Sequence, residues 1–289
     1  IVVKKRLDIE KDIYLKDHAI ENVPYMPAVM GIEAFAEASN LLYPDMQITS
    51  MKNIKFELPI KLLKDNPIDI FITVEKDRSS NGDLKLMAKI ETEFHNKDGI
   101  KLGTNKLHFI AEIYPTKTDL NFSKPEGDGR DIDIIARFSE DSKLEISDID
   151  IYKRFFHGPK FQVHGGVLDI DSDRIIGIMT VKDGDIFNFI DNPEFISNPM
   201  AIEAAFQNAG VLGMKRNNVM SLPDTIDELL YRNVPENIDK LYVRAKYAGA
   251  EDNKQIFDTE IIDRDGNIYS VMKGYKMITT GVLNDSEKF

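Results

Sequence analysis

Two apolar segments, far apart in the chain, carry nearly the same five residues. Met30-Gly-Ile-Glu-Ala34 recurs 170 residues later as Met200-Ala-Ile-Glu-Ala204. A turn sequence, Asp98-Gly99, recurs 167 residues later as Asp265-Gly266. Short apolar helices can resemble one another by chance, but here the two offsets agree within a few residues. We therefore predict a duplicated chain, in which each half folds as a similar unit.

The hydrophobic spacing gives each half one helix and several strands. Apolar residues recur at helical spacing over 28–42. A second helix is predicted over 199–212, with Pro199 at its first position and Ser197 or Asn198 as its N-cap. Strands are predicted at residues 49–60, 67–76, 84–95, 104–114, 174–182, 240–248, 255–262 and 267–279. One helix wrapped by an antiparallel sheet, twice over, suggests an α+β fold, the double hotdog.

A polar stretch separates the two predicted units. Residues 115–130 are rich in Pro, Gly and charged side chains, a composition typical of a linker. The predicted organisation is an N-terminal hotdog over 1–118, a linker over 119–138, a C-terminal hotdog over 139–280 and a tail over 281–289.

The composition disfavours several classes of function. The 289 residues carry 37 Lys and Arg against 49 Asp and Glu, a formal charge of −12, so a nucleic acid would be repelled. The sequence has no Cys, which excludes disulfides and thiol nucleophiles. No apolar run approaches the roughly 20 residues of a membrane span, and no secretory signal opens the chain. We expect a segment of a longer cytoplasmic polypeptide that binds neither nucleic acid nor membrane.

A histidine and a carboxylate are the best candidates for chemistry. His18 precedes a Pro-containing turn and the first helix, where it is either a capping or surface residue or a fixed ligand contact. Glu203 lies among Ala, Ile, Phe and Met, with Gln207 one turn further on the same face. Burial would raise the pKa of Glu203 and keep it protonated, as a general acid requires. Glu33, its repeat partner, shows that a Glu at this position can also be structural.

The remaining histidines offer no metal-binding spacing. The five histidines are His18, His95, His108, His157 and His164. None forms a His-x-x-x-His pair or a carboxylate-rich cluster, so we predict no metal. His157 belongs to an aromatic run, Tyr152 to Gln162, that is either an ordinary strand and turn or part of the lining of an apolar tunnel.

Three short motifs, taken in order, resemble the dehydratase domains of type I polyketide synthases. The first family motif is His-x3-Gly-x4-Pro, and here His18, Asn22 and Pro27 stand in it. The second is Gly-Tyr-x-Tyr-Gly-Pro-x-Phe, matched here by Phe156-His157-Gly158-Pro159-Lys-Phe161. The third is His-Pro-x3-Asp-x3-Gln/His, matched by Asn198-Pro199, Glu203 and Gln207. The resemblance covers roughly residues 5–280. The stretch that follows His18 looks especially similar to synthases of the enediyne and polyunsaturated fatty-acid type.

The resemblance implies a reaction and a set of roles. The family removes water from a 3-hydroxyacyl thioester carried on the phosphopantetheine arm of an acyl carrier protein, with no other cofactor. His18 would be the base that takes the C2 proton, and Glu203 the acid that protonates the leaving hydroxyl. Gln207 would orient the acid, and the backbone around Asn22 would meet the thioester carbonyl. The other expected substrate-binding residues are Pro27, Phe156, His157, Gly158, Pro159 and Phe161. Other synthase domains in the same polypeptide and a second copy, as a homodimer, are the further expected partners.

Four positions depart from the family motifs. Glu203 replaces an Asp, which moves the carboxyl one methylene outward, and His157 replaces a Tyr. Asn22 replaces a Gly, although Asn tolerates left-handed backbone better than most residues. Asn198 replaces a His. These changes leave three alternatives to a dehydratase open: a product-template type of cyclase, a catalytically inactive scaffold and a hotdog thioesterase.

Overall fold

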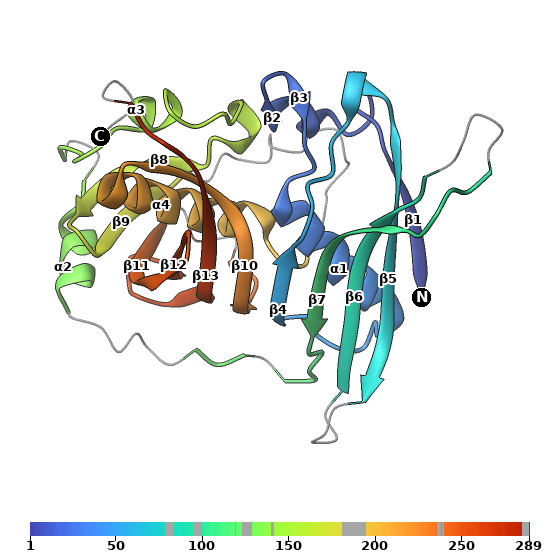
Figure 1. The fold of residues 1–289 in the computed structure, drawn as a ribbon. Helices are drawn as coiled ribbons and strands as arrows, with labels where there is room; N and C mark the ends of the chain where they lie inside the picture. The colour runs from blue at the N-terminus through green and yellow to red at the C-terminus, as the bar shows by residue number, and fades with distance from the viewer. Residues whose placement is uncertain are drawn as a thin grey trace.

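The computed structural model describes residues 1–78, 84–94, 100–118, 120–122, 129–139, 142–180, 195–235, 238, 240–284 and 289. These residues form two units of similar design, one from each half of the chain (Figure 1). His95 and the predicted turn Asp98-Gly99 lie outside the described residues.

The N-terminal unit has one long helix and one set of sheet strands. Its helix is α1 (Ala28–Leu42), as predicted. Its sheet strands are β1 (Val2–Leu7), β4 (Ser50–Phe56), β5 (Ile68–Arg78), β6 (Leu84–Thr92) and β7 (Lys106–Ile113). Its short elements are η1 (Ile13–Asp17), β2 (Ala19–Ile20), β3 (Val23–Pro24) and η2 (Leu63–Asp65), where η denotes a 3-10 helix.

The C-terminal unit repeats this plan around a longer helix, α4 (Pro199–Asn217). Its strands are β8 (His164–Ile170), β9 (Arg174–Met179), β10 (Val219–Tyr231), β11 (Leu241–Glu251), β12 (Lys254–Ile262) and β13 (Ile268–Val282). Its shorter helices are α2 (Gly129–Arg137), α3 (Asp148–Tyr152) and η3 (Pro159–Phe161).

The strands of both units join into one antiparallel sheet of 11 strands. The order is β1-β5-β6-β7-β4-β10-β13-β12-β11-β9-β8, so the units meet where β4 pairs with β10. At this junction Met51 lies opposite Leu229 and Ile54 opposite Ile226, and all four side chains are buried. The order on either side of the junction is nearly the mirror of the other, as a duplication requires.

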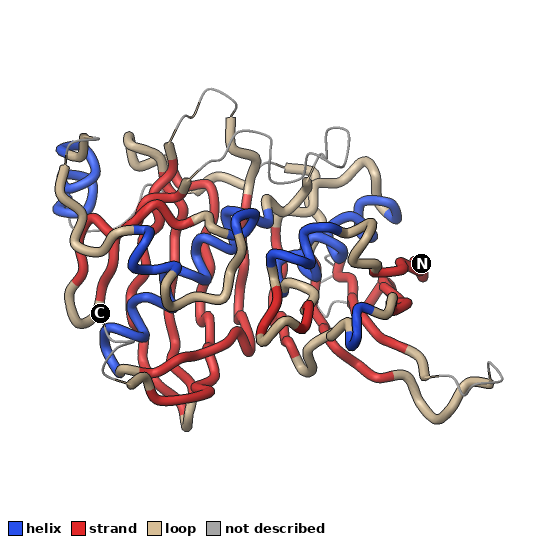
Figure 2. The backbone as a smooth tube through the Cα atoms, turned by 90° about the horizontal axis from the view of Figure 1, so that it is seen from above, coloured by secondary structure: helices blue, strands red, loops and turns tan. Residues whose placement is uncertain are grey.

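The two long helices lie inside the curved sheet and contact each other (Figure 2). Helix α1 buries Val29, Ile32 and Phe35, which stand at helical spacing. Helix α4 is covered on all sides, since every residue from Pro199 to Met214 is buried. The predicted α+β double hotdog is therefore the observed fold. No helix in the described part of the chain has the length and apolarity needed to cross a bilayer.

Three strands of the 11-stranded sheet were missed because their sequences lack the expected alternation. Strand β1 contains the charged run Lys4-Lys5-Arg6, which suits the exposed edge of a sheet. Strand β8 begins with His164-Gly-Gly, and β10 contains Pro223, beside which the register with β13 shifts. The predicted hairpin at Asp265-Gly266 does join β12 to β13, and Gly266 has a φ of +78° that favours glycine.

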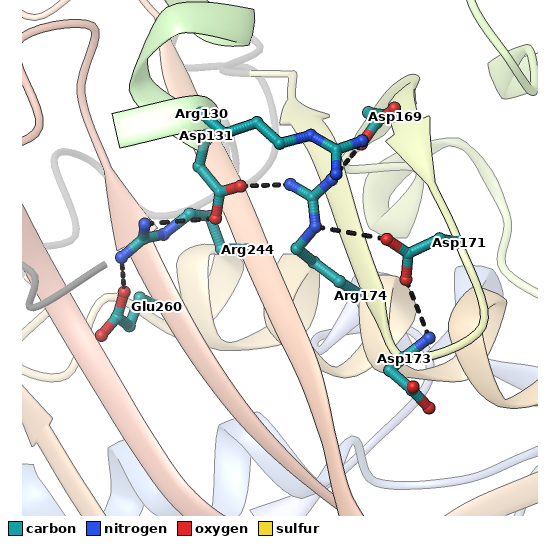
Figure 3. Close-up of polar contacts among 8 residues, drawn as sticks. All are labelled: Arg130, Asp131, Asp169, Asp171, Asp173, Arg174, Arg244 and Glu260. Atoms are coloured by element: carbon teal, nitrogen blue, oxygen red, sulfur yellow. Dashed lines mark hydrogen bonds and ion pairs between the residues drawn. The ribbon is translucent and has the colours of Figure 1, made fainter. Parts of the chain in front are cut away.

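Helix α2 lies within residues 119–138, where a linker was predicted, and it is tied to the sheet. Its Asp131 is buried and forms ion pairs with Arg174 of β9 and Arg244 of β11 (Figure 3). Arg174 also pairs with Asp169, and Arg244 with Glu260. Beside these charges, the buried Ile135 of α2 joins an apolar cluster with Ile176, Ile178, Tyr242, Ile262 and Ile268. This segment is thus part of the packed C-terminal unit.

Candidate active site

His18 is held by a tight hairpin that follows η1. The backbone N–H of Tyr25 donates to the His18 carbonyl at 2.9 Å, and the His18 ring lies 3.0 Å from the Tyr25 carbonyl through Nδ1. A carbonyl can only accept, so Nδ1 carries the proton and Nε2 keeps its lone pair. At the hairpin tip Asn22 has a φ of +63°, the left-handed backbone expected of the residue that replaces Gly. Asn22 itself is exposed.

Aromatic rings from the C-terminal unit surround the His18 ring. The ring centroids of Phe156, Phe161 and His157 lie 5.0, 5.3 and 5.6 Å from that of His18. The pKa of His18 is lowered to about 4, mainly by burial in this cluster; Glu203 opposes the shift and His157 adds to it. The imidazole is therefore neutral at pH 7, as a general base must be.

Glu203 lies on the buried face of α4 and receives two N–H groups on one oxygen. Its Oε1 is 2.9 Å from the Gln207 side-chain nitrogen and 3.1 Å from Nε2 of His157. Burial raises the pKa of Glu203, but the contact with His157 and the hydrogen bond from Gln207 outweigh it and leave the pKa below its ordinary value. The expectation that burial keeps Glu203 protonated was wrong, because the sequence does not reveal this His157 contact.

A chain of hydrogen bonds fixes Gln207. Its amide nitrogen also donates to the Phe161 carbonyl at 2.7 Å, and its amide oxygen accepts from the Tyr152 hydroxyl at 2.7 Å. The Tyr152 hydroxyl in turn accepts the His164 backbone N–H at 2.7 Å. Tyr152 was named from sequence only as the start of the aromatic run. Its bond to Gln207 makes it a support for the Glu203 carboxylate.

Gly158 brings the two units into contact beside His18. Its N–H donates to the carbonyl of Asp17, the residue before His18, at 2.8 Å. A β-carbon at position 158 would overlap a carboxylate oxygen of Asp17 and lie 2.9 Å from the Asp17 Cα. Pro159 then begins η3, which carries Phe161 toward His18.

Glu33, the repeat partner of Glu203, is also buried but has a different set of contacts. Its carboxylate accepts the backbone N–H of Ile196 at 2.7 Å and that of Ser197 at 2.8 Å, and also the Ser197 hydroxyl. These bonds hold the segment that leads into α4, where Asn198 is the N-cap in left-handed backbone. Glu33 thus fixes the start of the helix that carries Glu203.

The structure therefore brings together six of the residues predicted for the site. They are His18, Phe156, His157, Phe161, Glu203 and Gln207. Gly158 and Pro159 position this group, while Pro27 is buried as the N-cap residue of α1. Within the described ranges, no three His, Asp or Glu side chains meet in a way that could hold a metal ion.

Comparisons with known proteins agree with this fold. Residues 1–89 match the family model for the polyketide synthase dehydratase domain. A trans-AT polyketide synthase dehydratase domain from Brevibacillus brevis aligns with a TM-score of 0.74 and 19% identity, over 96% of this chain and 93% of that one. The dehydratase domain from the CurJ module of curacin polyketide synthase aligns with a TM-score of 0.75 and 14% identity, over 97% and 91%.

A third structure, the dehydratase domain from the CurF module of the same synthase, aligns with a TM-score of 0.74 and 14% identity, over 96% of this chain and 93% of that one. No curated protein sequence matches the chain. The protein is thus an α+β double hotdog of the kind found in polyketide synthase dehydratase domains. The resemblance inferred from the three motifs is confirmed over the N-terminal residues by the family model and over nearly the whole chain by the fold.

Proposed function

We propose that this chain removes water from a 3-hydroxyacyl thioester to give a 2-enoyl thioester. The observation that carries the proposal is the placement of two unlike groups in one buried cluster. His18 is neutral, with a free Nε2, and Glu203 is an anion paired with His157. A base and a source of protons, close together and shielded from water, are what a syn or anti elimination of water requires.

In the proposed reaction His18 Nε2 takes the proton from C2. The electrons of that C–H bond form the C2–C3 double bond as the C3–O bond breaks. The pair formed by Glu203 and His157 supplies the proton with which the hydroxyl leaves as water. Gln207 and Tyr152 hold Glu203 in place through the bonds described above. The backbone near Asn22 would meet the thioester carbonyl.

The proposed substrate is delivered by a partner. The acyl group would arrive on the phosphopantetheine arm of an acyl carrier protein, and other domains of a cytoplasmic synthase would supply and consume it. A 3-hydroxyacyl group is the product of a 3-ketoacyl reduction, so a ketoreductase-type reaction must precede this step. The elimination would use protein side chains alone. We further propose that two copies associate as a homodimer.

The test is to incubate the purified chain with a 3-hydroxyacyl thioester and to identify the product by mass spectrometry. We expect an enoyl thioester, lighter than the substrate by one water. A cyclised product from a longer polyketone thioester would instead indicate a product-template activity, and a free acid would indicate a thioesterase. Unchanged thioester, with the chain correctly folded, would indicate an inactive scaffold.

A further inference from the structure

Two departures from the family motifs contact each other in this structure. The family has Asp where this chain has Glu203, and Tyr where it has His157. The Glu203 carboxyl, one methylene further from the backbone, meets the imidazole of His157 with 3.1 Å between Oε1 and Nε2. Both side chains are almost completely buried, with 5% and 8% exposed. The two substitutions therefore create a buried pair of a carboxyl group and an imidazole, in place of a carboxyl group and a phenol.

The hydrogen bonds define which atoms of this pair carry protons. Oε1 of Glu203 accepts the Gln207 N–H, and its contact with His157 requires Nε2 of that ring to be the donor. An oxygen that accepts two N–H groups carries no proton itself, and the lowered pKa of Glu203 favours the carboxylate over the neutral acid. A carboxylate cannot donate a proton. The group that protonates the leaving hydroxyl must then be sought next to Glu203.

The other nitrogen of His157 is the candidate. His157 Nδ1 is buried and has no hydrogen-bond partner among the described residues. The ring is held flat against Phe156, with centroids 4.2 Å apart and 22° between the planes, and its edge faces Phe155. A buried polar nitrogen without a partner is costly in a folded protein. This one lies in the cluster that contains the base, 5.6 Å from the His18 ring between centroids.

We propose, on the basis of the dehydration proposed above, that His157 is the catalytic acid of this chain and that Glu203 is its positioning and charge-stabilising partner. The substrate hydroxyl is the partner for which Nδ1 is left open. In the proposed step His157 donates from Nδ1 while its Nε2 contacts the Glu203 carboxylate, and His18 begins neutral.

Atoms and charges balance in this step. The C2–H and C3–O bonds break, the C2–C3 double bond forms, and the proton on His157 Nδ1 leaves with the hydroxyl as water. His18 is left as the imidazolium and His157 becomes neutral, so the positive charge moves between two rings whose centroids lie 5.6 Å apart. Proton exchange between the rings, through water after product release, restores the starting state.

The test separates the acid from the base by changing the leaving group. A 3-hydroxyl group needs a proton to leave, whereas a 3-fluoro group of similar size leaves as fluoride without one. The variant is His157→Gln, whose amide can still donate to Glu203 but has no group equivalent to Nδ1. Wild type, His157→Gln, Glu203→Gln and His18→Ala are each assayed on the 3-hydroxyacyl and the 3-fluoroacyl thioester. His108→Gln is the matched control, because His108 is also buried but contacts Thr92 and Leu58 outside the site.

We expect His157→Gln to lose about 10²-fold or more of the rate with the hydroxyl substrate and less than about tenfold with the fluoro substrate. An equal loss on both substrates would assign His157 to packing and overturn the inference. Two results together would identify Glu203 itself as the acid. His157→Gln would eliminate water at a rate within about tenfold of wild type, and Glu203→Gln would lose this activity. If His18→Ala kept full activity on both substrates, His18 could not be the base, and the proposed function would be contradicted.

A second measurement does not depend on the variant folding. Nitrogen-15 NMR of the histidine rings in the wild-type chain reports the protonation of each nitrogen. We expect Nε2 of His157 to keep its proton throughout the titration, and Nδ1 to carry one at the pH of maximal dehydration. An unprotonated Nδ1 at that pH would overturn the inference.

Discussion

Gly158 of the C-terminal unit packs so closely against Asp17 of the N-terminal unit that a β-carbon on it would lie 2.9 Å from the Asp17 Cα. Asp17 precedes His18, and Gly158 follows His157. This contact therefore sets the distance between the proposed base, on one unit, and the pair that includes Glu203, on the other. The glycine is required by this close approach, since its φ is −74° and any residue could adopt it.

Gly158→Ala is expected to push Asp17 and His18 away from His157. A displacement of order 1 Å in an active site can reduce the rate about 10²-fold, so kcat/KM for dehydration should fall by about that factor. Gly281→Ala is the control, because no atom lies within 4 Å of the position its β-carbon would take. Equal activity of both variants would show that the Gly158 contact does not position the site.

Glu33→Gln is expected to destabilise the fold through the segment before α4. The amide cannot accept all three donors of Ile196 and Ser197 that the carboxylate now binds, and an unsatisfied buried group costs about 1–3 kcal/mol. Urea unfolding measures the change. Glu57→Gln, at an exposed position outside helix α1, should change the free energy of unfolding by less than about 0.5 kcal/mol. Equal effects in the two variants would contradict a specific role for Glu33.

Lowering the pH is expected to destabilise the folded protein, because the buried His164 resists protonation. This ring is fully buried, donates from Nε2 to Asn208 at 2.9 Å and accepts the Gly166 N–H on Nδ1, and burial lowers its pKa to about 4. The unfolded chain takes up the proton near pH 6.5, whereas the folded chain does so only near pH 4. Stability therefore falls as the pH decreases between these values, by about 3 kcal/mol for this group.

The comparison of His164→Gln with wild type isolates this effect. The variant should be less stable at pH 7, and the difference in the free energy of unfolding should narrow by about 3 kcal/mol as the pH approaches 4. His18 has a similar shift and is unchanged in the variant, so its contribution cancels. A difference that stays constant with pH would show that His164 does not resist protonation in the folded state.

Asp131→Asn is expected to weaken the attachment of α2 to the sheet without changing the dehydration activity. The change removes the anion shared by Arg174 and Arg244, and breaking a buried ion pair costs about 3 kcal/mol. Arg174 keeps Asp169 and Asp171, and Arg244 keeps Glu260, which limits the loss. Hydrogen exchange should increase in residues 129–137, while kcat/KM for dehydration at low temperature stays within about twofold of wild type, because none of these charges touches the site. Unchanged exchange would contradict the docking role of Asp131.

The sequence predicted those parts of the fold whose patterns are local. The repeated Ile-Glu-Ala segment located α1 and α4, and the alternation of apolar residues located β6 and β7. The strand β10, by contrast, contains Pro223 and is specified by its two neighbours, β4 and β13, rather than by its own pattern. Helix α2 could not be predicted from its polar sequence. The role of Asp131 in its packing depends on Arg174 and Arg244, which only the folded chain brings together.

The sequence predicted which residues form the site but not the protonation state of Glu203. The three motifs indicated His18, His157, Glu203 and Gln207 because each keeps its order along the chain. The protonation state of Glu203 depends on Nε2 of His157, which is 46 residues away in sequence and packed against it in space. Glu33 and Tyr152 act through contacts 163 and 55 residues distant, and no spacing in the sequence marks such contacts.

The most direct test of the central claim is single-turnover dehydration of a 3-hydroxyacyl thioester deuterated at C2. In the wild-type chain the deuterated substrate should react more slowly than the undeuterated one, with one deuterium retained at C2 of the enoyl product. His18→Ala and Glu203→Gln, both correctly folded, should lose about 10²-fold or more of the rate. Formation of the enoyl thioester at the wild-type rate by His18→Ala would contradict the claim that this side chain removes the C2 proton.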